Sequence, residues 1–340
     1  MRLLVDGRIL GAAHPTGVER ALRTLLVGLV RIGGDHEVRL AGARFAGCRT
    51  VPALGRLRTP GPEVADLLLS PVTAVPPFGA MPRIATVHDL PWVSRASVRS
   101  TQREWRQRIR LALTRRAAGR IQVPSRATGR SLERVPGENP PIDVIPLGLH
   151  PDVLGPVDDE ARARAESLIG NLSGSILLNV GAPRRRKAPA RLLMALATIR
   201  RERSATLVLA GPDSERFADR EGVLALGFVE DAVLRALYDR ADVLVHASPF
   251  EGCGLTPLEA MARGTPVVAA AAEAVVETVG DAAELVPVGD PVALGESVLR
   301  VLEDTALRED LVARGRAVAA ARTPEAHAEA VLASCREALR

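Results

Sequence analysis

The stretch SPFEGCGLTPLEAMARGTPVVAA, residues 248–270, sets out a local fold by the order of its apolar runs, glycines and prolines. The apolar run that ends just before it, at Ala247, predicts a buried parallel strand followed by a glycine-bearing loop. Thr256-Pro257 predicts a helix start, with an N-cap and then a proline at the first helical position. Gly264 ends that helix, and residues 266–270 predict the next strand. A strand, loop, short helix and strand in this order are typical of a doubly wound α/β sheet.

Two carboxylates, Glu251 and Glu259, flank the predicted loop and helix start. Loop amides and the N-terminus of a helix favour a bound anion such as a phosphate. The carboxylates would repel that phosphate unless they reach past it to hydroxyl groups. The combination suggests a sugar nucleotide, with one acid for the ribose diol and the other for the sugar. An alternative stays open, because Thr256 and Glu259 also match a plain capping box.

Residues 251–269, EGCGLTPLEAMARGTPVVA, resemble the E-x7-E signature of the retaining GT-B glycosyltransferases of family 4 (glycosyl transferases group 1). This resemblance implies an α/β fold of two Rossmann-like, doubly wound parallel-sheet domains that face each other across a cleft. The pattern is most similar to mannosyltransferases and related hexosyltransferases. It implies transfer of a hexosyl group from GDP-mannose or a UDP-sugar to an acceptor hydroxyl, with retention of configuration.

Composition agrees with a folded two-domain protein. The chain has 340 residues, 47% of them hydrophobic, which is enough for two cores. Only 2% are aromatic, which disfavours base stacking and hence a nucleic-acid partner. The apolar runs are too short to span a membrane, and the first residues do not read as a signal peptide. Three widely spaced cysteines predict a reducing, cytoplasmic setting.

The predicted domain boundaries follow composition and the family pattern. We expect an acceptor-binding domain over residues 1–150 and a nucleotide-sugar-binding domain over 175–322. Residues 151–174, rich in Pro, Asp and Gly, predict an exposed linker with a short helix over 159–169. Residues 323–340 predict a final helix, which in the family commonly packs back on the first domain.

Two candidate site residues lie in the first domain. Gly17 follows the first predicted strand and loop, where a family glycine lets the acceptor and the donor diphosphate come close. The plainer reading is an ordinary helix start, in which Thr16 and Glu19 match a capping box. His88 follows the buried strand 84–87 in a segment that resembles the family's V-T-x-H-D-L, whose histidine lines the cleft near the donor sugar. A purely structural histidine is the alternative; a hydrolase triad lacks its G-x-S-x-G elbow.

The segment 99–120 predicts an arginine-rich helix that also carries Trp105, Ile109 and Leu113. A solvated amphipathic helix of a basic protein accounts for this pattern. A surface that faces a lipid-linked or anionic acceptor accounts for it as well. The net charge of +5 is compatible with phosphorylated substrates or an anionic membrane surface and does not decide between the two.

The donor-binding residues are expected mainly in the second domain. Strand 176–180 leads into GAPRRRK, residues 181–187, which resembles the family's V-G-x-x-x-P-R-K loop. The resemblance implies that Arg186 and Lys187 bind the diphosphate of the donor. Residues 227–229 resemble the segment whose backbone frames the base. With Glu251, His88, Arg186 and Lys187 as catalytic residues, the expected donor-binding set is Gly17, Gly181, Gly227, Phe228, Val229, Gly252, Cys253, Gly254, Leu255, Thr256 and Glu259.

No D-x-D motif lies near a predicted strand end, so we expect neither a metal nor a cofactor besides the nucleotide sugar. Arg186, Lys187 and the helix at Thr256 would neutralise the leaving diphosphate. Glu251 would hold the sugar, Glu259 the ribose, and His88 would approach the sugar from the other domain. The expected acceptor is a small molecule, a glycan or a lipid-linked group, with peripheral contact at the inner membrane face left open.

Three other classes of protein compete with this reading. An NAD-dependent oxidoreductase would need a G-x-G-x-x-G after the first strand, and the sequence has none there. A GT-B phosphorylase would need a far longer chain. A non-catalytic GT-B binding module would not need Glu251, Glu259, Arg186 and Lys187 together.

Overall fold

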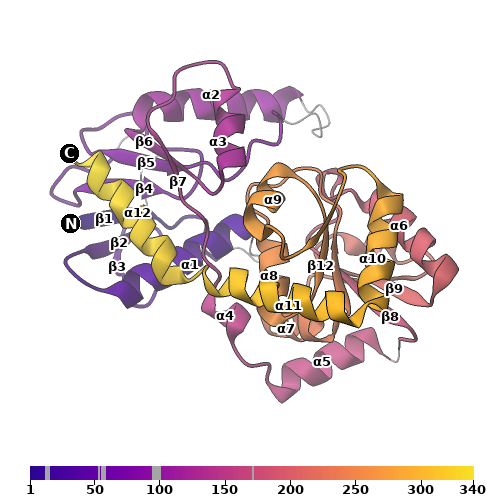
Figure 1. Cartoon of the computed structure of the whole chain (residues 1–340). Coiled ribbons are helices and arrows are strands. Elements are labelled where there is room, and N and C mark those ends of the chain that lie inside the picture. Colours follow the sequence, from indigo (N-terminus) through magenta and orange to yellow (C-terminus); the bar gives the residue numbers. More distant parts are fainter. Residues whose placement is uncertain (12–15, 53, 55–58, 94–100, 171) are drawn as a thin grey trace. The chain divides into compact units, whose positions relative to one another are not determined.

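The computed structural model describes residues 1–11, 16–52, 54, 59–93, 101–170 and 172–340. These residues form two compact units, one made of Met1–His150 and Arg322–Arg340 and the other of Pro151–Ala321 (Figure 1). Each unit is a parallel sheet covered by helices, because its strands are apolar runs that need cover on both faces. This confirms the predicted α/β fold of two doubly wound parallel sheets.

The first unit has the strand order β3-β2-β1-β4-β5-β6-β7, and all of its described strand pairs are parallel. The order changes direction between β1 and β4, which makes the carboxyl ends of these strands a switch point. The strands are β1 (Arg2–Asp6), β2 (Glu37–Ala41), β3 (Arg49–Val51), β4 (Leu67–Ser70), β5 (Arg83–Thr86), β6 (Arg120–Val123) and β7 (Ile142–Val144). The helices are α1 (Gly17–Ile32), α2 (Thr101–Ala117), α3 (Arg126–Glu133) and α12 (Pro324–Ala338).

The last helix, α12, is built into this first unit and packs along α1 (Figure 1). The two backbones approach closely at Gly28, where an added Cβ would lie 2.0 Å from the carbonyl oxygen of Pro324. Ser334 of α12 accepts a hydrogen bond from Gln122 of β6 and donates one to Asp143 of β7. The C-terminal segment is therefore tied both to a helix and to the sheet.

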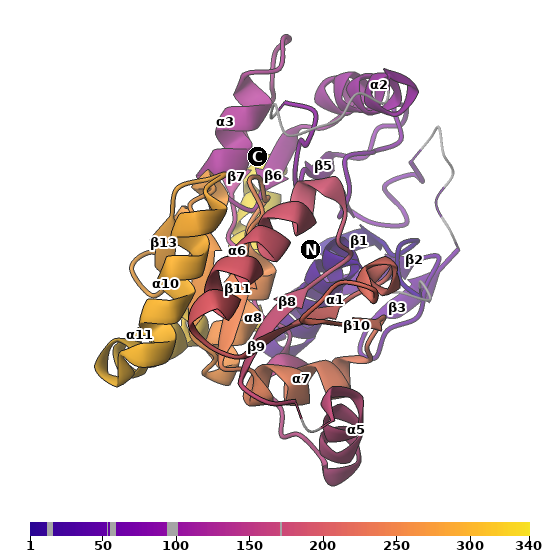
Figure 2. The same ribbon diagram turned by 90° about the vertical axis from the view of Figure 1, so that its right-hand side faces the viewer.

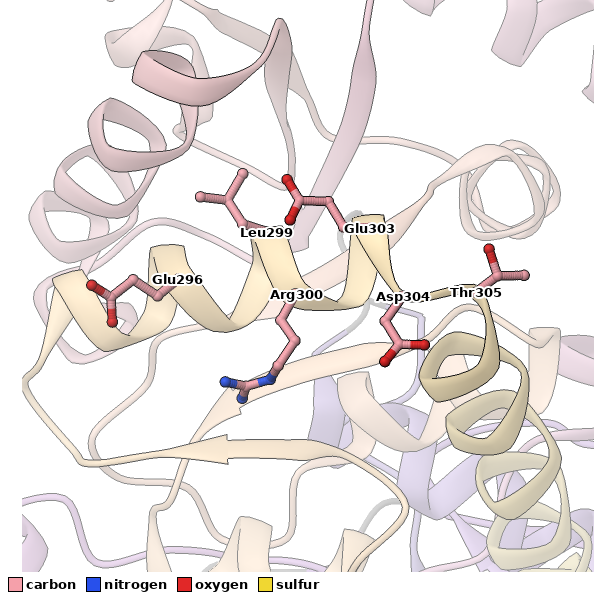
Figure 3. Close-up of a pocket in the computed structure, with 6 residues that line it drawn as sticks. All are labelled: Glu296, Leu299, Arg300, Glu303, Asp304 and Thr305. Atoms are coloured by element: carbon pink, nitrogen blue, oxygen red, sulfur yellow. The ribbon is translucent and has the colours of Figure 1, made fainter.

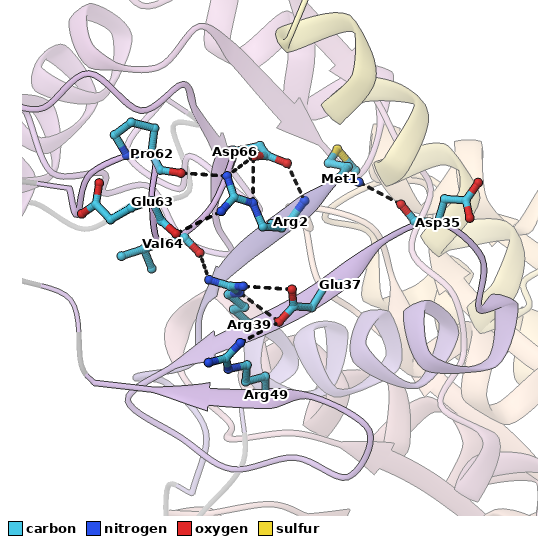
Figure 4. A network of polar contacts seen from close by, with 10 residues as sticks. All are labelled: Met1, Arg2, Asp35, Glu37, Arg39, Arg49, Pro62, Glu63, Val64 and Asp66. Atoms are coloured by element: carbon cyan, nitrogen blue, oxygen red, sulfur yellow. Dashed lines mark hydrogen bonds and ion pairs between the residues drawn. The ribbon is translucent and has the colours of Figure 1, made fainter.

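Polar side chains near the amino ends of β1, β2 and β4 satisfy one another (Figure 4). The Arg2 guanidinium pairs with Asp66 at 2.6 Å and donates to the carbonyls of Pro62 and Glu63. Arg39 pairs with Glu37 at 2.9 Å. This edge is opposite to the strand ends that lead to Gly17 and His88, so the network stabilises the sheet and leaves the other edge for a site.

The second unit has the strand order β10-β9-β8-β11-β12-β13, again with parallel pairs, and its switch point lies between β8 and β11. The strands are β8 (Ser175–Val180), β9 (Ala205–Ala210), β10 (Val223–Gly227), β11 (Val243–His246), β12 (Val267–Ala270) and β13 (Glu284–Val286). The helices are α4 (Pro151–Leu154), α5 (Asp159–Ile169), α6 (Pro189–Glu202), α7 (Asp231–Arg240), α8 (Leu255–Arg263), α9 (Glu273–Val279), α10 (Pro291–Glu303) and α11 (Thr305–Ala320). Figure 2 shows α6 beside α10, and apolar residues of both join those of β8, β9 and β11 in one core.

Some elements differ from the expectations. The expected linker, residues 151–174, belongs to the second unit, where Arg263 donates to the carbonyls of Val153 and Gly155. Within it, the helix predicted over 159–169 is confirmed as α5. The helix expected over 99–120 is α2, described from Thr101 because residues 94–100 lie outside the described part, and it ends at Ala117, since Arg120 begins β6. In the ranges that the structure covers, no helix combines the length and the hydropathy needed to cross a membrane.

Candidate functional site

The predicted signature connects β11 to α8 at the switch point of the second sheet. The helix begins earlier than predicted, because Gly254 is its N-cap and adopts a left-handed conformation with φ 90° that glycine tolerates. Thr256 and Pro257 therefore lie inside the first turn, and the prediction of an N-cap at Thr256 is wrong. Since no side chain caps α8 within the described residues, the capping-box alternative for Thr256 and Glu259 is also wrong.

Glu259 has a different partner, on the neighbouring helix α7. Its Oε2 accepts a hydrogen bond of 2.9 Å from the hydroxyl of Tyr238, and both side chains are buried. Thr265 holds the same segment, because its Oγ1 donates to the carbonyl of Tyr238 at 2.7 Å. The Glu259 carboxylate is thus anchored inside the second unit, within the first turns of α8.

Glu251 lies in the loop between β11 and α8 and contacts both predicted diphosphate ligands. Its Oε1 is 2.7 Å from Lys187 Nζ, and its Oε2 is 3.4 Å from Arg186 Nη1. The two cations come from the 3-10 turn Arg185–Lys187, which follows β8. Because β8 and β11 are neighbours in the sheet, their carboxyl ends bring Glu251 to Lys187 and Arg186, which lie 64 and 65 positions before it in the sequence.

Sequence reasoning missed His246, the last residue of β11. This imidazole is 1% exposed, and its Nε2 lies 3.4 Å from Glu251 Oε1. Burial lowers the pKa of His246, which favours its neutral form. Burial alone would raise the pKa of Glu251, but Lys187, His246 and Arg186 together hold that pKa well below its ordinary value. A histidine at the carboxyl end of an apolar strand was the available signal, and it is the same signal that singled out His88.

The glycine loop before α8 is held by α9. The Oγ1 of Thr278 donates to the carbonyl of Cys253 at 2.5 Å, and both residues are buried. This bond fixes the direction of the peptide group between Cys253 and Gly254, directly ahead of the first turn that carries Leu255 and Thr256. Fixed amides at the start of a helix are suited to an anion.

The other predicted backbone positions of the second unit meet along the ends of β8, β9 and β10. Gly181 donates its N–H to the carbonyl of Ala210, and Gly211 donates to that of Gly227. An added Cβ at Gly211 would lie 2.4 Å from the carbonyl carbon of Gly181, so the loops touch backbone to backbone. Gly211 is a second residue that sequence reasoning missed. Beyond Gly227, Phe228 is partly exposed and Val229 is buried.

Gly17 and His88 belong to the first unit, and the other predicted site residues belong to the second. Gly17 starts α1 after Thr16, whose Oγ1 accepts a hydrogen bond from Glu19 N, which is the Thr16 half of the predicted capping box. The buried Glu19 carboxylate accepts from Gly11 N and pairs with Arg23. Residues 12–15, which precede Thr16, lie outside the described part.

His88 follows β5, and its Nε2 lies 2.9 Å from the carbonyl oxygen of Pro71. Burial lowers the pKa of His88. With His327 of α12 it lines a small cavity of about 20 Å³ inside the first unit. Burial and the neighbouring His88 lower the pKa of His327 to about 4.

A surface hollow of about 620 Å³ lies elsewhere, where α10 meets α11 (Figure 3). Leu299 and Glu303 project from one side of α10, and Arg300 projects from the other. Two of its charged residues have structural partners, because Arg300 pairs with Glu284 and Asp304 caps α11. Within the described ranges, no group of three or more His, Cys, Asp or Glu side chains is placed to hold a metal ion.

Comparison with known proteins gives the same family as the motifs. Residues 174–304 match the family glycosyl transferases group 1. The O-antigen chain mannosyltransferase B of Escherichia coli is 42% identical over 101 residues, which are 29% of this chain and 26% of that protein. The D-inositol 3-phosphate glycosyltransferase of Acidothermus cellulolyticus is 30% identical over 256 residues, or 68% of this chain and 56% of that protein. The chain thus spans only part of the curated relatives it matches.

Solved structures share the fold over the whole chain. The sucrose-phosphate synthase of Thermosynechococcus elongatus has a TM-score of 0.78 at 22% identity, over 99% of this chain and 98% of that one. Anabaena HepE, solved in complex with UDP-glucose, has a TM-score of 0.76 at 19% identity, over 99% of this chain and 100% of that one. Residues 174–304 thus match the glycosyl transferases group 1 family, and the two parallel-sheet units have the GT-B fold.

Proposed function

We propose that this protein is a retaining glycosyltransferase that moves a hexosyl group from a nucleoside diphosphate sugar to an acceptor hydroxyl. One observation carries the proposal: Glu251, Arg186 and Lys187 meet at the switch point of the second sheet, directly before the helix that bears Glu259. Carboxylates that can accept hydrogen bonds from sugar hydroxyls and cations that can bind phosphates thus lie together at the carboxyl ends of neighbouring strands. The names of the relatives, a mannosyltransferase and an inositol phosphate glycosyltransferase, support the same class.

Each residue of this edge takes one part of the donor. Arg186 and Lys187, with the N-terminus of α8, bind the diphosphate, and the peptide groups from Gly252 to Leu255 contact sugar and phosphate. Glu251 holds the sugar hydroxyls, and Glu259 accepts from the ribose diol. The backbone at Gly181 adjoins the diphosphate, and that of residues 227–229 frames the base. From the first unit, His88 contacts the sugar, and Gly17 lets the acceptor come close.

The proposed chemistry needs no base from the protein. The bond between the anomeric carbon and the phosphate oxygen breaks, and its electron pair stays on the diphosphate. The acceptor oxygen bonds to the same face of the sugar and gives its proton to the departing phosphate oxygen. Arg186 and Lys187 stabilise the charge that develops there, and one such donor is worth about 3 to 4 kcal/mol in comparable oxyanion sites. We propose that no metal ion takes part.

The donor that the motifs favour is GDP-mannose, with UDP-sugars as the alternative. The name of the Escherichia coli relative, a mannosyltransferase, supports the mannose donor, and the complex of HepE with UDP-glucose supports the UDP-sugar. The acceptor is a small molecule, a glycan or a lipid-linked group.

A peripheral membrane contact through α2, at the inner face, belongs to the proposal. Trp105, Ile109 and Leu113 are spaced like one face of a helix and are 65%, 37% and 44% exposed, with arginines between them. Sedimentation with anionic and with neutral vesicles tests this contact. Trp105→Ser should abolish binding to the anionic vesicles, and equal binding to both vesicle types would rule out an electrostatic contact.

The test of the function combines binding with turnover. GDP, UDP and dTDP are compared by their effect on the melting temperature, since a ligand at 100 times its Kd adds about 2.7 kcal/mol of stability. Donor hydrolysis and transfer are then screened across a panel of nucleotide sugars. A melting shift with NAD and none with the three diphosphates would favour the oxidoreductase. Binding of a diphosphate without turnover of any sugar would favour the non-catalytic module.

Variants in the β8 loop locate the diphosphate. Lys187→Ala should weaken binding of the nucleoside diphosphate far more than binding of the nucleoside. Arg185→Ala is the matched control, because Arg185 belongs to the same turn and is exposed. Equal losses for nucleoside and diphosphate would place Lys187 outside the phosphate site.

A further inference from the structure

Glu251 already neutralises the two cations that the proposed donor would need. Its side chain is 10% exposed, that of Lys187 is 12% exposed, and their charged atoms are 2.7 Å apart. Arg186 completes the cluster at 3.4 Å from the other carboxylate oxygen. A diphosphate anion that binds Arg186 and Lys187 therefore competes with Glu251 for the same charges.

Such competition has a cost that the fold must offset. Removing one partner from a buried ion pair typically costs about 3 to 5 kcal/mol, because the remaining charge stays buried without compensation. If both cations paired with the diphosphate instead, Glu251 would be a buried charge without a compensating partner. Another hydrogen-bond donor at the carboxylate would limit the loss.

His246 is placed to be that donor. Its Nε2 is 3.4 Å from Glu251 Oε1, the oxygen that Lys187 contacts. That nitrogen is buried and has no hydrogen-bond partner among the residues that the structure describes. A neutral imidazole protonated at Nε2 can donate one hydrogen bond without adding charge to the site.

We propose that donor binding exchanges the partners of Glu251: Arg186 and Lys187 pass to the diphosphate, and Nε2–H of His246 takes their place at the carboxylate. His246 is then a positioning residue that holds one oxygen of Glu251 while the other accepts from the sugar hydroxyls. This inference rests on the proposed function. It also gives Glu251 a second role, because after transfer the acid competes with the product diphosphate for the cations and favours its release.

The signs of the expected effects are specific. Glu251→Gln removes the competing charge, so a nucleoside diphosphate without sugar should bind about tenfold more tightly. His246→Phe removes the replacement donor, so the same ligand should bind about tenfold more weakly. In the double variant His246→Phe should have no further effect, because no buried charge needs the donor. His246→Asn, which keeps an N–H donor, should recover part of the loss.

The experiment is a double-mutant cycle on the full chain, with the Kd of GDP or UDP measured by titration calorimetry and melting temperatures as a folding check. His246→Leu replaces the phenylalanine variant if that variant folds poorly. If His246→Phe weakens diphosphate binding equally in the unmodified protein and in the Glu251→Gln variant, the role of His246 is merely structural. Unchanged or weaker binding by Glu251→Gln would also overturn the exchange. If the unmodified protein binds neither diphosphate, the proposed function fails, and the exchange fails with it.

Discussion

Tyr238 sets the position of an acid that we assign to the donor ribose. Its hydroxyl donates to Glu259 Oε2 at 2.9 Å, and both groups are buried. A hydrogen bond to a charged group contributes about 1.5 to 3 kcal/mol. Tyr238→Phe should therefore weaken binding of a ribonucleoside diphosphate about tenfold. Binding of the 2′,3′-dideoxy analogue, which lacks the diol, should stay the same when both are measured by calorimetry.

A matched control separates this role from packing. Thr265→Val removes the hydrogen bond from Thr265 to the carbonyl of Tyr238 and leaves the phenol in place. It should lower the melting temperature without changing the preference for ribose over dideoxyribose. If Tyr238→Phe weakens both ligands equally, Glu259 does not contact the diol.

His327 links burial to the pH dependence of stability. Burial and His88 lower its pKa to about 4, whereas the unfolded chain takes up the proton near its ordinary value of 6.5. Between these values the unfolded state binds more protons, so the free energy of unfolding falls as pH falls, by about 3 kcal/mol for this group. The lowered pKa values of His88 and His246 act in the same direction.

His327→Leu should reduce this loss of stability. Urea unfolding at pH 7 and pH 4.5 should show a smaller drop for the variant than for the unmodified protein. From pH 7 to pH 8.5, above both values, the two proteins should change in parallel. The same drop for both proteins would mean that His327 is protonated in the fold.

Among single residues, Glu251, Arg186 and Lys187 could be predicted from the sequence, because each lies in a motif or in a loop at the end of a strand. Tyr238 and His246 were missed for a physical reason. Their relevance comes from what they touch, and Tyr238 meets Glu259 only because α7 packs beside α8. A buried polar residue on a helix or strand carries no such information until its neighbours are known.

Among the elements, the contact between α1 and α12 depends on a glycine. An added methyl group at Gly28 would lie 2.0 Å from the Pro324 carbonyl oxygen, and a backbone atom cannot move aside cheaply. Alanine is about 1 kcal/mol better than glycine within a helix, whereas forced overpacking costs about 1 to 3 kcal/mol. The cost of the clash should exceed the gain in helix propensity, so Gly28→Ala should lower the free energy of unfolding measured in urea.

Gly129 provides the matched control within the same unit. It lies inside α3, and its added methyl group would be 3.7 Å from a Val123 side-chain carbon, an ordinary contact. Gly129→Ala should therefore be neutral or stabilising by up to about 1 kcal/mol. If both substitutions stabilise the protein, α1 and α12 do not pack as closely as the structure has them.

Long apolar strands and helices were predictable from their periodicity, and short elements were not. The run that ends at Ala247 gave β11, and the strand predicted over residues 176–180 is β8, which is buried along most of its length. The short β3 has mainly exposed residues, so no alternation of apolar and polar side chains marked it as a strand. The start of α8 was misplaced because a proline usually marks the first turn, whereas the left-handed Gly254 began the helix earlier.

At the scale of the whole molecule, one unit is continuous in sequence and the other is not. Residues 151–321 contain Glu251, Glu259, Arg186 and Lys187 together with the entire second sheet. The first unit needs residues 322–340, because α12 supplies four buried side chains to its core: Ala328, Val331, Leu332 and Cys335. The two units should therefore respond differently when the chain is divided.

Expressed alone, residues 151–321 should fold cooperatively and bind the nucleoside diphosphate with the affinity of the full chain, as measured by urea unfolding and calorimetry. Residues 1–150 alone should not fold, because each buried Val or Leu contributes about 1.5 to 3 kcal/mol and a domain has only about 5 to 15 kcal/mol to lose. Joining 1–150 to 322–340 through a short glycine linker should restore folding, since Leu149 N already donates to the Arg322 carbonyl at 2.7 Å. Cooperative folding of 1–150 alone would show that α12 is dispensable. Loss of diphosphate binding by a folded 151–321 would show that the donor site needs residues of the first unit.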